Sequence, residues 1–311
     1  MQTKHQIQEL LSAAGVSPNR RLGQHFLVDL NLLRLLVDSA EPGASDAVLE
    51  VGCGTGSLTQ ALAERAGAVV AVEIDRTLAP IAEAQLSGRQ NVQIVNADVL
   101  AGKGALNPVV IEALERARIK SIGRIGPTGP IQRGPEASLG RLLLVSNLPY
   151  DVASPVMIHL AKGPVAADAM FVTVQKEVAE RMTAEPGGRD YGTLSIFLQA
   201  TGEVEILRIL KPSVFWPPPA VDSAMIRFVR DDHKSRRIED MAILSDIVGL
   251  LMRHRRKMLR ACLKSVPAHL GDWDLWMRIL EQQGIDPTLR PGDLTAAQYV
   301  DLANALRHSR P

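Results

Sequence analysis

Short apolar runs recur along the first half of the chain, and a stretch with helical spacing follows most of them. The runs open the segments AVLEVGCGTGSL, AVVAVEID, NVQIVNADVL and RLLLVSNLPY, which begin at residues 47, 68, 91 and 141. They are typical of buried strands, and helices are expected at about 57–65, 76–86 and 155–161. Strands that alternate with helices predict an α/β fold with a parallel sheet, and such sheets bind ligands beyond the carboxyl ends of their strands.

The alternation is interrupted twice. Residues 101–140 are rich in Gly, Pro and basic residues and predict a surface excursion, whereas residues 231–237, DDHKSRR, predict a charged linker. Beyond the linker, the spacing of apolar residues predicts helices at about 238–264, 272–283 and 294–307. We therefore expect an α/β domain over residues 1–230, with an insertion at about 101–140, and a smaller all-helical domain over residues 238–311.

Composition excludes several classes of protein. Of the 311 residues 46% are apolar, enough for a sizeable core, and the net charge of +1 gives no molecule-wide field that would attract nucleic acid. Cys53 and Cys262 lie far apart without partners at metal-ligand spacing, so we expect neither a disulfide framework nor a metal site. No apolar run approaches the roughly 18 residues that cross a bilayer. The sequence thus predicts a cytoplasmic protein without a membrane contact.

Three glycines follow the first apolar run, in the segment EVGCGTG. Gly52, Gly54 and Gly56 stand between a predicted strand and a predicted helix, where glycine allows a tight turn and the close approach of a ligand. Glu73 ends the next strand, and a carboxylate at that place can accept hydrogen bonds from both ribose hydroxyls of an adenosine cofactor. The combination predicts a cofactor that contains adenosine.

Two cofactor classes fit such a loop, dinucleotides and S-adenosylmethionine. The dinucleotide pattern places its third glycine where this chain has Ser57. The G-x-G-x-G spacing, preceded by Glu50, instead resembles the first motif of Rossmann-type methyltransferases, which use S-adenosylmethionine. In that family an acid just beyond the third strand contacts the adenine amino group, and Asp98 stands at this position.

The fourth run ends in SNLPY, residues 146–150, where the strand end would face the methyl group of such a cofactor. The exocyclic amine of adenine is a poor nucleophile because its lone pair is delocalised into the ring. The side-chain oxygen of Asn147 and the carbonyl of Leu148 can each accept one N–H bond of that amine, which favours the pyramidal form with a free lone pair. Pro149 would stiffen the loop, and Tyr150 can stack on an extruded base. No metal is required, because a sulfonium is already an activated leaving group.

The motifs occur in the order of a known family, and the chain resembles the small-subunit ribosomal RNA adenine-N6,N6-dimethyltransferases over nearly its whole length. The matching segments are GQHFLVD, EVGCGTGSLT, VEIDRTL, NADVL, SNLPYDVASP, VQKEVAERMTAEPGGRDYGTLSI, VFWPPPAVDSAMIRF, RHRRKMLRACL and GIDPTLRPGDLTAAQYVDLANAL. The resemblance implies a Rossmann-like class I methyltransferase domain that uses S-adenosylmethionine, with a smaller C-terminal all-helical domain. It also implies dimethylation of two adjacent adenosines in the 3′-terminal hairpin of 16S ribosomal RNA, on the assembling 30S subunit, by a monomer.

The same resemblance implies which residues form the site. The cofactor pocket would be lined by Gln24, His25, Leu27, Gly52, Gly54, Glu73, Asp98 and Asn147. Catalysis would rest on Asn147, Leu148, Pro149 and Tyr150, with Phe215 as a second aromatic wall for the target adenine. The chain departs from the family pattern at His25, where many members have Asn, and at Cys53, where Pro is frequent.

The segment RHRRKMLRACLK, residues 253–264, carries several cations and no acid. On a helix, one broad face would hold Arg253, Arg256, Lys257, Arg260 and Lys264. These cations would contact RNA phosphates, and binding through phosphates weakens steeply with salt. Arg20 and Arg21 would extend this patch, and residues 187–192, GGRDYG, are expected to form a flexible loop that closes over RNA.

Three other functions fit parts of the pattern. An assembly or transcription factor that kept the fold and lost the chemistry would have no need of Glu73, Asp98 and Asn147 together. A relative that modifies large-subunit RNA and confers antibiotic resistance tends to end its Asn motif in Phe, where this chain has Tyr150. Enzymes that methylate glutamine or DNA amines share the chemistry but usually have Pro where this chain has Leu148.

Overall fold

The computed structural model describes residues 1–19, 22–102, 104–122 and 140–309. The chain divides into two compact units: unit 1 comprises Met1–Ala179 and Ile206–Phe228, and unit 2 comprises Glu180–Glu205 and Val229–Pro311. The chain therefore enters unit 2, returns to unit 1 for one segment, and then completes unit 2.

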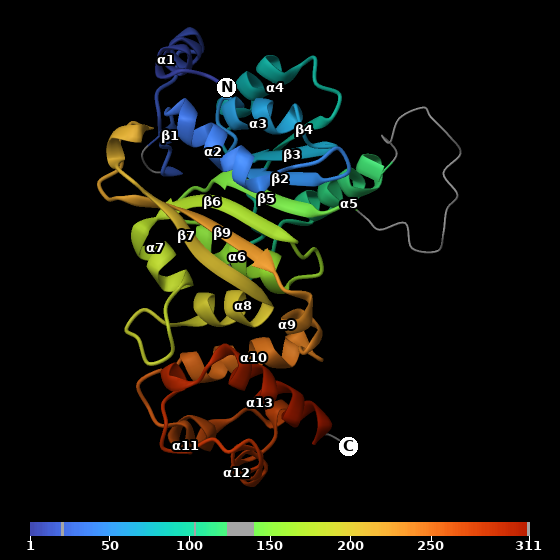
Figure 1. Ribbon diagram of the computed structural model, residues 1–311, viewed down its shortest axis with the longest axis vertical. Coiled ribbons are helices and arrows are strands. Elements are labelled where there is room, and N and C mark those ends of the chain that lie inside the picture. The colour runs from blue at the N-terminus through green and yellow to red at the C-terminus, as the bar shows by residue number, and fades with distance from the viewer. Residues whose placement is uncertain (20–21, 103, 123–139, 310–311) are drawn as a thin grey trace. The chain divides into compact units, whose positions relative to one another are not determined.

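A seven-stranded sheet forms the centre of unit 1 (Figure 1), in the order β4-β3-β2-β5-β6-β9-β7. Its strands are β2 (Ala47–Val51), β3 (Ala68–Glu73), β4 (Val92–Asn96), β5 (Leu142–Asn147), β6 (Ala169–Gln175), β7 (Gly202–Leu210) and β9 (Ser223–Arg230). Strands β2 to β6 pair in parallel, which confirms the predicted α/β fold. On one side of β2 the sheet continues with β3 and β4, and on the other side it continues with β5 and β6. The order of the strands along the chain therefore reverses between β2 and β5. Ligands of parallel sheets bind at such a reversal of strand order, here the carboxyl ends of β2 and β5.

The helices of unit 1 pack on this sheet because the strands are apolar on both faces; every residue of β2 and β3 is buried. These helices are α2 (Leu30–Ala40), α3 (Ser57–Ala63), α4 (Leu78–Leu86), α5 (Pro108–Ile122) and α6 (Ala153–Lys162). The helix α1 (Lys4–Ala13) instead buries Ile7 and Leu11 against Leu78 of α4. A separate antiparallel pair joins β1 (Phe26–Leu27) to β8 (Phe215–Trp216). It links the segment before α2 to the segment between β7 and β9.

The helix α5 corrects the prediction for residues 101–140. Val110, Ala113 and Leu114 are fully buried, and α5 packs on β2, β3 and β4. These apolar positions have helical spacing, but the Gly and Pro content of the longer segment hid it in the sequence. The prediction of a surface excursion is therefore wrong for 108–122, and residue 103 and residues 123–139 lie outside the described residues.

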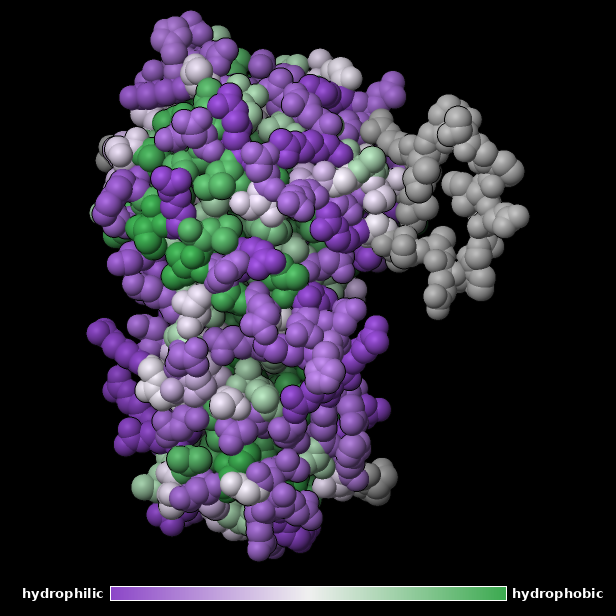
Figure 2. Space-filling view, viewed as in Figure 1, coloured by the Kyte–Doolittle hydropathy of each residue, from purple (hydrophilic) through white to green (hydrophobic). Residues whose placement is uncertain are grey.

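The edge strand β7 carries apolar side chains that reach the surface. Ile206, Leu207 and Ile209 are 37%, 38% and 40% exposed, and Figure 2 shows apolar side chains at the surface over this part of unit 1. An exposed apolar edge is prone to pair with other strands, and charged neighbours oppose such pairing. Glu205 and Arg208 stand within this stretch and supply those charges.

Unit 2 is helical. It contains α8 (Thr193–Thr201), α9 (Asp232–Arg236), α10 (Met241–Met252), α11 (Leu259–Cys262), α12 (Trp273–Gln282) and α13 (Ala296–His308). The helix α7 (Lys176–Met182) spans the boundary between the units. The predicted linker at 231–237 is wrong, because Asp231 caps α9 by accepting from the backbone N–H of Lys234, and the Asp231 N–H donates to Thr201.

The predicted continuous helix over 238–264 is also wrong. The helix α10 ends at Met252, and residues 253–257 form turns before the short helix α11. Residues 253–257 bring no apolar side chain to a core, and Arg253, Arg256 and Lys257 would repel one another at helical spacing. The backbone N–H groups of Leu259 and Arg260 donate instead to carbonyls of the loop at 287–289.

Candidate functional site

A cavity of about 260 Å³ opens at the carboxyl ends of the parallel strands in unit 1. Of the residues predicted for the site, those that line it are Gln24, His25, Leu27, Gly52, Gly54, Glu73, Asp98, Asn147, Leu148, Pro149 and Tyr150. The structure thus brings together five segments that are far apart in the sequence. Phe215 is not among the lining residues.

The glycine loop follows β2 and has left-handed backbone angles. Gly52, Gly54 and Gly56 have φ values of +76°, +58° and +83°, which other residues rarely adopt. A Cβ atom on Gly52 would lie 2.8 Å from Cγ of Pro149. Glycine at position 52 therefore lets the loop approach the segment that follows β5.

Glu73 closes the glycine loop from the end of β3. Its carboxylate accepts from the backbone N–H of Gly54 at 2.8 Å and from that of Asp75 at 2.9 Å. Burial raises the pKa of the Glu73 carboxyl, and the two backbone donors oppose the shift. Gln24 donates to the Asp75 carboxylate at 2.8 Å, so the loop before β1 is tied to the same corner. A carboxylate can accept more than two hydrogen bonds, so Glu73 retains capacity for a ligand.

Glu50 is an acid of the cavity that the sequence prediction did not include among the site residues. Its side chain is 2% exposed, and its Oε2 atom has no hydrogen-bond partner among the described residues. Burial raises the pKa of Glu50 to about 8; the nearby Thr59 side chain opposes the shift, and the charge of Glu73 adds to it. Its place directly before the glycine motif was the signal that could have identified it.

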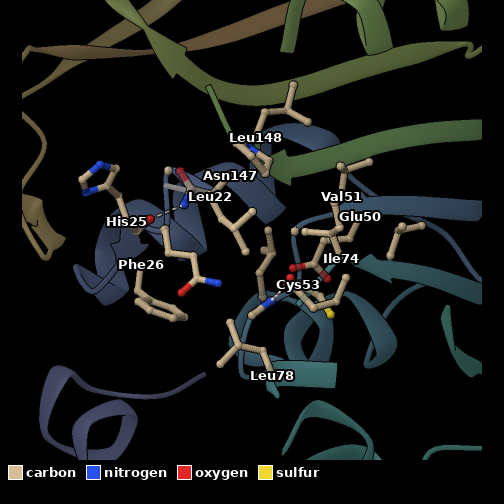
Figure 3. A pocket seen from close by; sticks show the side chains of 18 of the residues that line it. Leu22, His25, Phe26, Glu50, Val51, Cys53, Ile74, Leu78, Asn147 and Leu148 are labelled. Atoms are coloured by element: carbon tan, nitrogen blue, oxygen red, sulfur yellow. Dashed lines mark hydrogen bonds between the residues drawn. The ribbon is translucent and has the colours of Figure 1, made fainter. Parts of the chain in front are cut away.

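The side chain of Asn147 is fixed at both ends. Its Nδ2 donates to the backbone carbonyl of His25 at 2.7 Å (Figure 3), and its Oδ1 accepts from the hydroxyl of Thr173. Thr173 lies opposite Asn147 on the neighbouring strand β6. The amide lines the cavity with its remaining donor and acceptor capacity.

Tyr150 is held at its ring and at its hydroxyl. The ring stacks on that of His25 with centroids 5.6 Å apart, and the hydroxyl hydrogen-bonds with that of Ser223 at 2.9 Å. The Nδ1 atom of His25 lies 2.7 Å from the carbonyl of Pro217. Burial raises the pKa of Tyr150, which keeps its hydroxyl protonated. One ring face of Tyr150 is thus occupied by His25.

Phe215 lies beside the cavity wall rather than on it. It pairs with Leu27 across β1 and β8, and its side chain is 3% exposed. The neighbouring Trp216 stacks on Phe26 with ring centroids 6.2 Å apart. Leu27 lines the cavity, whereas Phe215 does not.

The N-terminal segment also contacts the glycine loop, which the sequence prediction missed. The backbone N–H of Gln2 donates to the Ser57 hydroxyl at 2.8 Å, and its side-chain amide exchanges two hydrogen bonds with Thr55. Gln2 is 7% exposed, and Ile7 of α1 lines the cavity. Residues 2–7 therefore hold the loop and form part of the wall.

The charged groups of the cavity are mainly acidic. Its lining includes Glu50, Glu73, Asp98 and Asp151, and no Lys or Arg among the described residues lines it. Such a cavity favours a ligand with positive charge.

The basic segment of unit 2 is exposed although it is not one helix. Arg253, Arg256, Lys257 and Arg260 are all exposed, and none forms an ion pair with another described residue. Arg20 and Arg21 lie outside the described residues.

The loop at 187–192 is anchored, contrary to the expectation of a flexible loop. Arg255 donates to the carbonyl of Gly188 at 2.6 Å, and Gly187 donates to that of Gly292 at 2.7 Å. Tyr191 is fully buried.

Neither a membrane-spanning helix nor a cluster of metal ligands occurs in the part of the chain that the structure describes. None of its helices combines the length and apolar character that crossing a membrane requires. None of its His, Cys, Asp and Glu side chains gather in threes or more as metal ligands would.

Comparisons with known proteins agree with the geometry. The pattern of the family described as "Ribosomal RNA adenine dimethylase" matches residues 15–307. "Ribosomal RNA small subunit methyltransferase A" of Geobacillus thermodenitrificans is 36% identical, over 98% of this chain and 96% of that protein. The protein of the same name from Bacillus mycoides is 34% identical over the same shares of the two chains.

Two solved structures share the fold. A dimethyladenosine transferase from Plasmodium falciparum superposes with a TM-score of 0.66 at 21% identity, covering 89% of this chain and 96% of that one. The 23S rRNA methyltransferase ErmE superposes with a TM-score of 0.57 at 24% identity, covering 91% and 99%. These superpositions confirm the predicted methyltransferase fold.

Proposed function

Since the chain belongs to the ribosomal RNA adenine dimethylase family, we propose that it dimethylates the N6 amines of two adjacent adenosines in the 3′-terminal hairpin of small-subunit ribosomal RNA. The methyl donor is S-adenosylmethionine. The enzyme acts in the cytoplasm, as a monomer, on the assembling 30S subunit. One observation carries the proposal: residues 147–150 line the same cavity as the glycine loop, Glu73 and Asp98.

The cavity fits this cofactor by charge and by shape. S-adenosylmethionine carries a sulfonium and an ammonium against a single carboxylate, so it is a net cation, and the cavity is lined by four acids. Glu73 would hold the ribose hydroxyls, Asp98 the adenine amine, and the backbone at Gly52 and Gly54 would allow close approach. When bound, the cofactor supplies a methyl group on a sulfonium, which is an activated leaving group.

The residues after β5 act on the target amine. The oxygen of Asn147 and the carbonyl of Leu148 accept its two N–H bonds, which orients the amine and favours a free lone pair. The side chain of Asn147 is already oriented by His25 and Thr173, so little reorganisation opposes this contact. The methylated amine can lose its proton to water, and the scheme uses no side-chain base.

Tyr150 receives the extruded base on one ring face, because His25 already covers the other. The hydrogen bond to Ser223 fixes the plane of the ring before RNA binds. Phe215 as a second aromatic wall stays a prediction. It requires the ring to become accessible, because Phe215 is buried and does not line the cavity.

The exposed cations Arg253, Arg256, Lys257 and Arg260 bind RNA phosphates. Two observations support this role: these side chains are exposed, and none of them forms an ion pair with another described residue. A paired cation would have to break its ion pair before it could bind a phosphate. The turns at 253–257 present Arg253, Arg256 and Lys257 on a loop, and Arg260 lies on the short helix α11, so the four cations do not share one helical face.

Methyl transfer from labelled S-adenosylmethionine to purified small subunits that lack the modification tests the function. We expect label on two adjacent adenosines of the 3′-terminal hairpin, identified by mass spectrometry of RNA fragments. Label in large-subunit RNA alone would favour the resistance-type activity. Binding to small subunits without any transfer would favour a non-catalytic assembly factor.

A further inference from the structure

Thr173 places a hydroxyl inside an otherwise apolar strand. The six residues of β6 from Ala169 to Val174 are all buried, and Thr173 is 1% exposed. A buried hydroxyl without a partner is unfavourable by about 1–3 kcal/mol. The partner that satisfies it is the side-chain oxygen of Asn147, directly opposite on β5.

The hydrogen-bond network allows one orientation of the Asn147 amide. The carbonyl of His25 can only accept, so the Nδ2 group must face it, at 2.7 Å. The Oδ1 atom then faces Thr173, whose hydroxyl must donate. A rotation of the amide by half a turn would place oxygen against the His25 carbonyl, which would lose its donor, and would turn the Thr173 hydroxyl from a donor into an acceptor.

Thr173 also holds the backbone of the next residue. Its carbonyl accepts from the N–H of Leu148 at 3.1 Å. The hydroxyl thus fixes the side chain of Asn147, and the carbonyl fixes the peptide that joins Asn147 to Leu148. The side-chain oxygen of Asn147 is one of the two acceptors that the proposed mechanism uses to orient the target amine.

We propose that Thr173 is a positioning residue for methyl transfer, which holds the amide of Asn147 so that its free lone pair faces the incoming adenine amine. The inference rests on the proposed function, since it needs Asn147 as the acceptor. If the side-chain oxygen of Asn147 is displaced, it would bind the amine in orientations that do not react. The loss would therefore fall on the transfer rate and not on cofactor binding.

The test compares Thr173→Val, which keeps shape and β-branching but cannot donate, with Thr173→Ser, which restores the hydroxyl. We expect the single-turnover transfer rate to fall about 10-fold in the valine variant and to recover largely in the serine variant. The affinity for S-adenosylmethionine, measured by calorimetry, should change less than about twofold in both, since an unaltered cavity binds equally well.

Thr201→Val is the matched control for stability. Thr201 is a fully buried threonine whose hydroxyl donates to a backbone carbonyl, and it lies in unit 2, outside the cavity. We expect this variant to lose stability and keep the transfer rate. If the transfer rate falls in both Thr173→Val and Thr201→Val, in the same proportion to the fall in melting temperature, the inference is overturned.

A spectroscopic readout follows the amide itself. The side-chain NH₂ of Asn147, assigned by its absence in Asn147→Ala, should exchange with solvent faster in Thr173→Val than in the native protein. Native exchange and a native rate in Thr173→Val, with Asn147→Ala inactive, would refute the role of Thr173 and leave the proposed function intact. Full activity of Asn147→Ala would refute the proposed mechanism instead.

Discussion

The unpartnered acid in the cavity allows a quantitative prediction for Glu50→Gln. Burial raises the pKa of Glu50 from 4.5 to about 8. At any pH between these two pKa values, the folded chain keeps the Glu50 proton, whereas the unfolded chain releases it. The free energy of unfolding is therefore highest below pH 4.5 and falls as the pH rises toward 8. Each pH unit corresponds to 1.36 kcal/mol, so the free energy of unfolding falls by about 5 kcal/mol in total, as an order of magnitude.

Glutamine has nearly the same shape and does not ionise, so the variant escapes this loss. Its amide brings its own burial cost, which does not depend on pH. The free energy of unfolding of Glu50→Gln minus that of the native protein should therefore rise by about 3 kcal/mol between pH 5 and pH 8. Above about pH 8, where Glu50 is ionised, the same change also removes a negative charge from the cavity, so S-adenosylmethionine should bind more weakly there.

Urea unfolding without cofactor, followed by circular dichroism at several pH values, measures the difference. Glu115→Gln, at an exposed position on α5, is the matched control and should give a difference that stays constant with pH. A constant difference for Glu50→Gln as well would refute the reasoning. It would mean that the Glu50 carboxyl is solvated or paired in solution.

Two further predictions concern the wall of the cavity and the basic segment. Gln2→Ala removes the side-chain hydrogen bonds with Thr55, so the glycine loop should become more mobile. The Kd for S-adenosylmethionine should then rise by about 5-fold, which corresponds to about 1 kcal/mol. An unchanged Kd would show that the glycine loop keeps its conformation without these hydrogen bonds. Arg256→Ala with Lys257→Ala should weaken RNA binding and lower the slope of log affinity against log salt by about 1.5. The charge-matched control is Arg116→Ala with Lys120→Ala on α5; an equal effect there would refute a localised patch.

The strands and the site could be predicted because each signal was local. A continuous apolar run such as 142–145 has few alternatives to a buried strand, and positions 52 and 54 closely follow the similar run at 47–51. The carboxyl ends of parallel strands meet at one edge, so residues after different strands were expected to share a cavity. The cavity lining confirms this for Glu73, Asp98 and Asn147.

The missed features depend on pairing between distant segments. The register of β5 and β6 places Thr173 opposite Asn147, and nothing in either segment alone reveals that register. The basic segment at 253–257 has helical composition, but the backbone N–H groups of Leu259 and Arg260 just after it donate to a loop at 287–289 that lies far along the chain. His25 illustrates the same limit: its backbone carbonyl orients Asn147, and that contact does not depend on the side chain at which the sequence departs from the family pattern.

Single-turnover transfer by Asn147→Ala, with the cofactor bound, tests the central claim most directly. The account predicts that the rate falls at least about 100-fold, as when an oriented polar group is removed from a reacting centre. The Kd for S-adenosylmethionine, measured in parallel, should remain within about twofold, since Glu73, Asp98 and the glycine loop are untouched. A transfer rate equal to that of the native enzyme would contradict the account, because no acceptor at position 147 would then be needed to orient the amine.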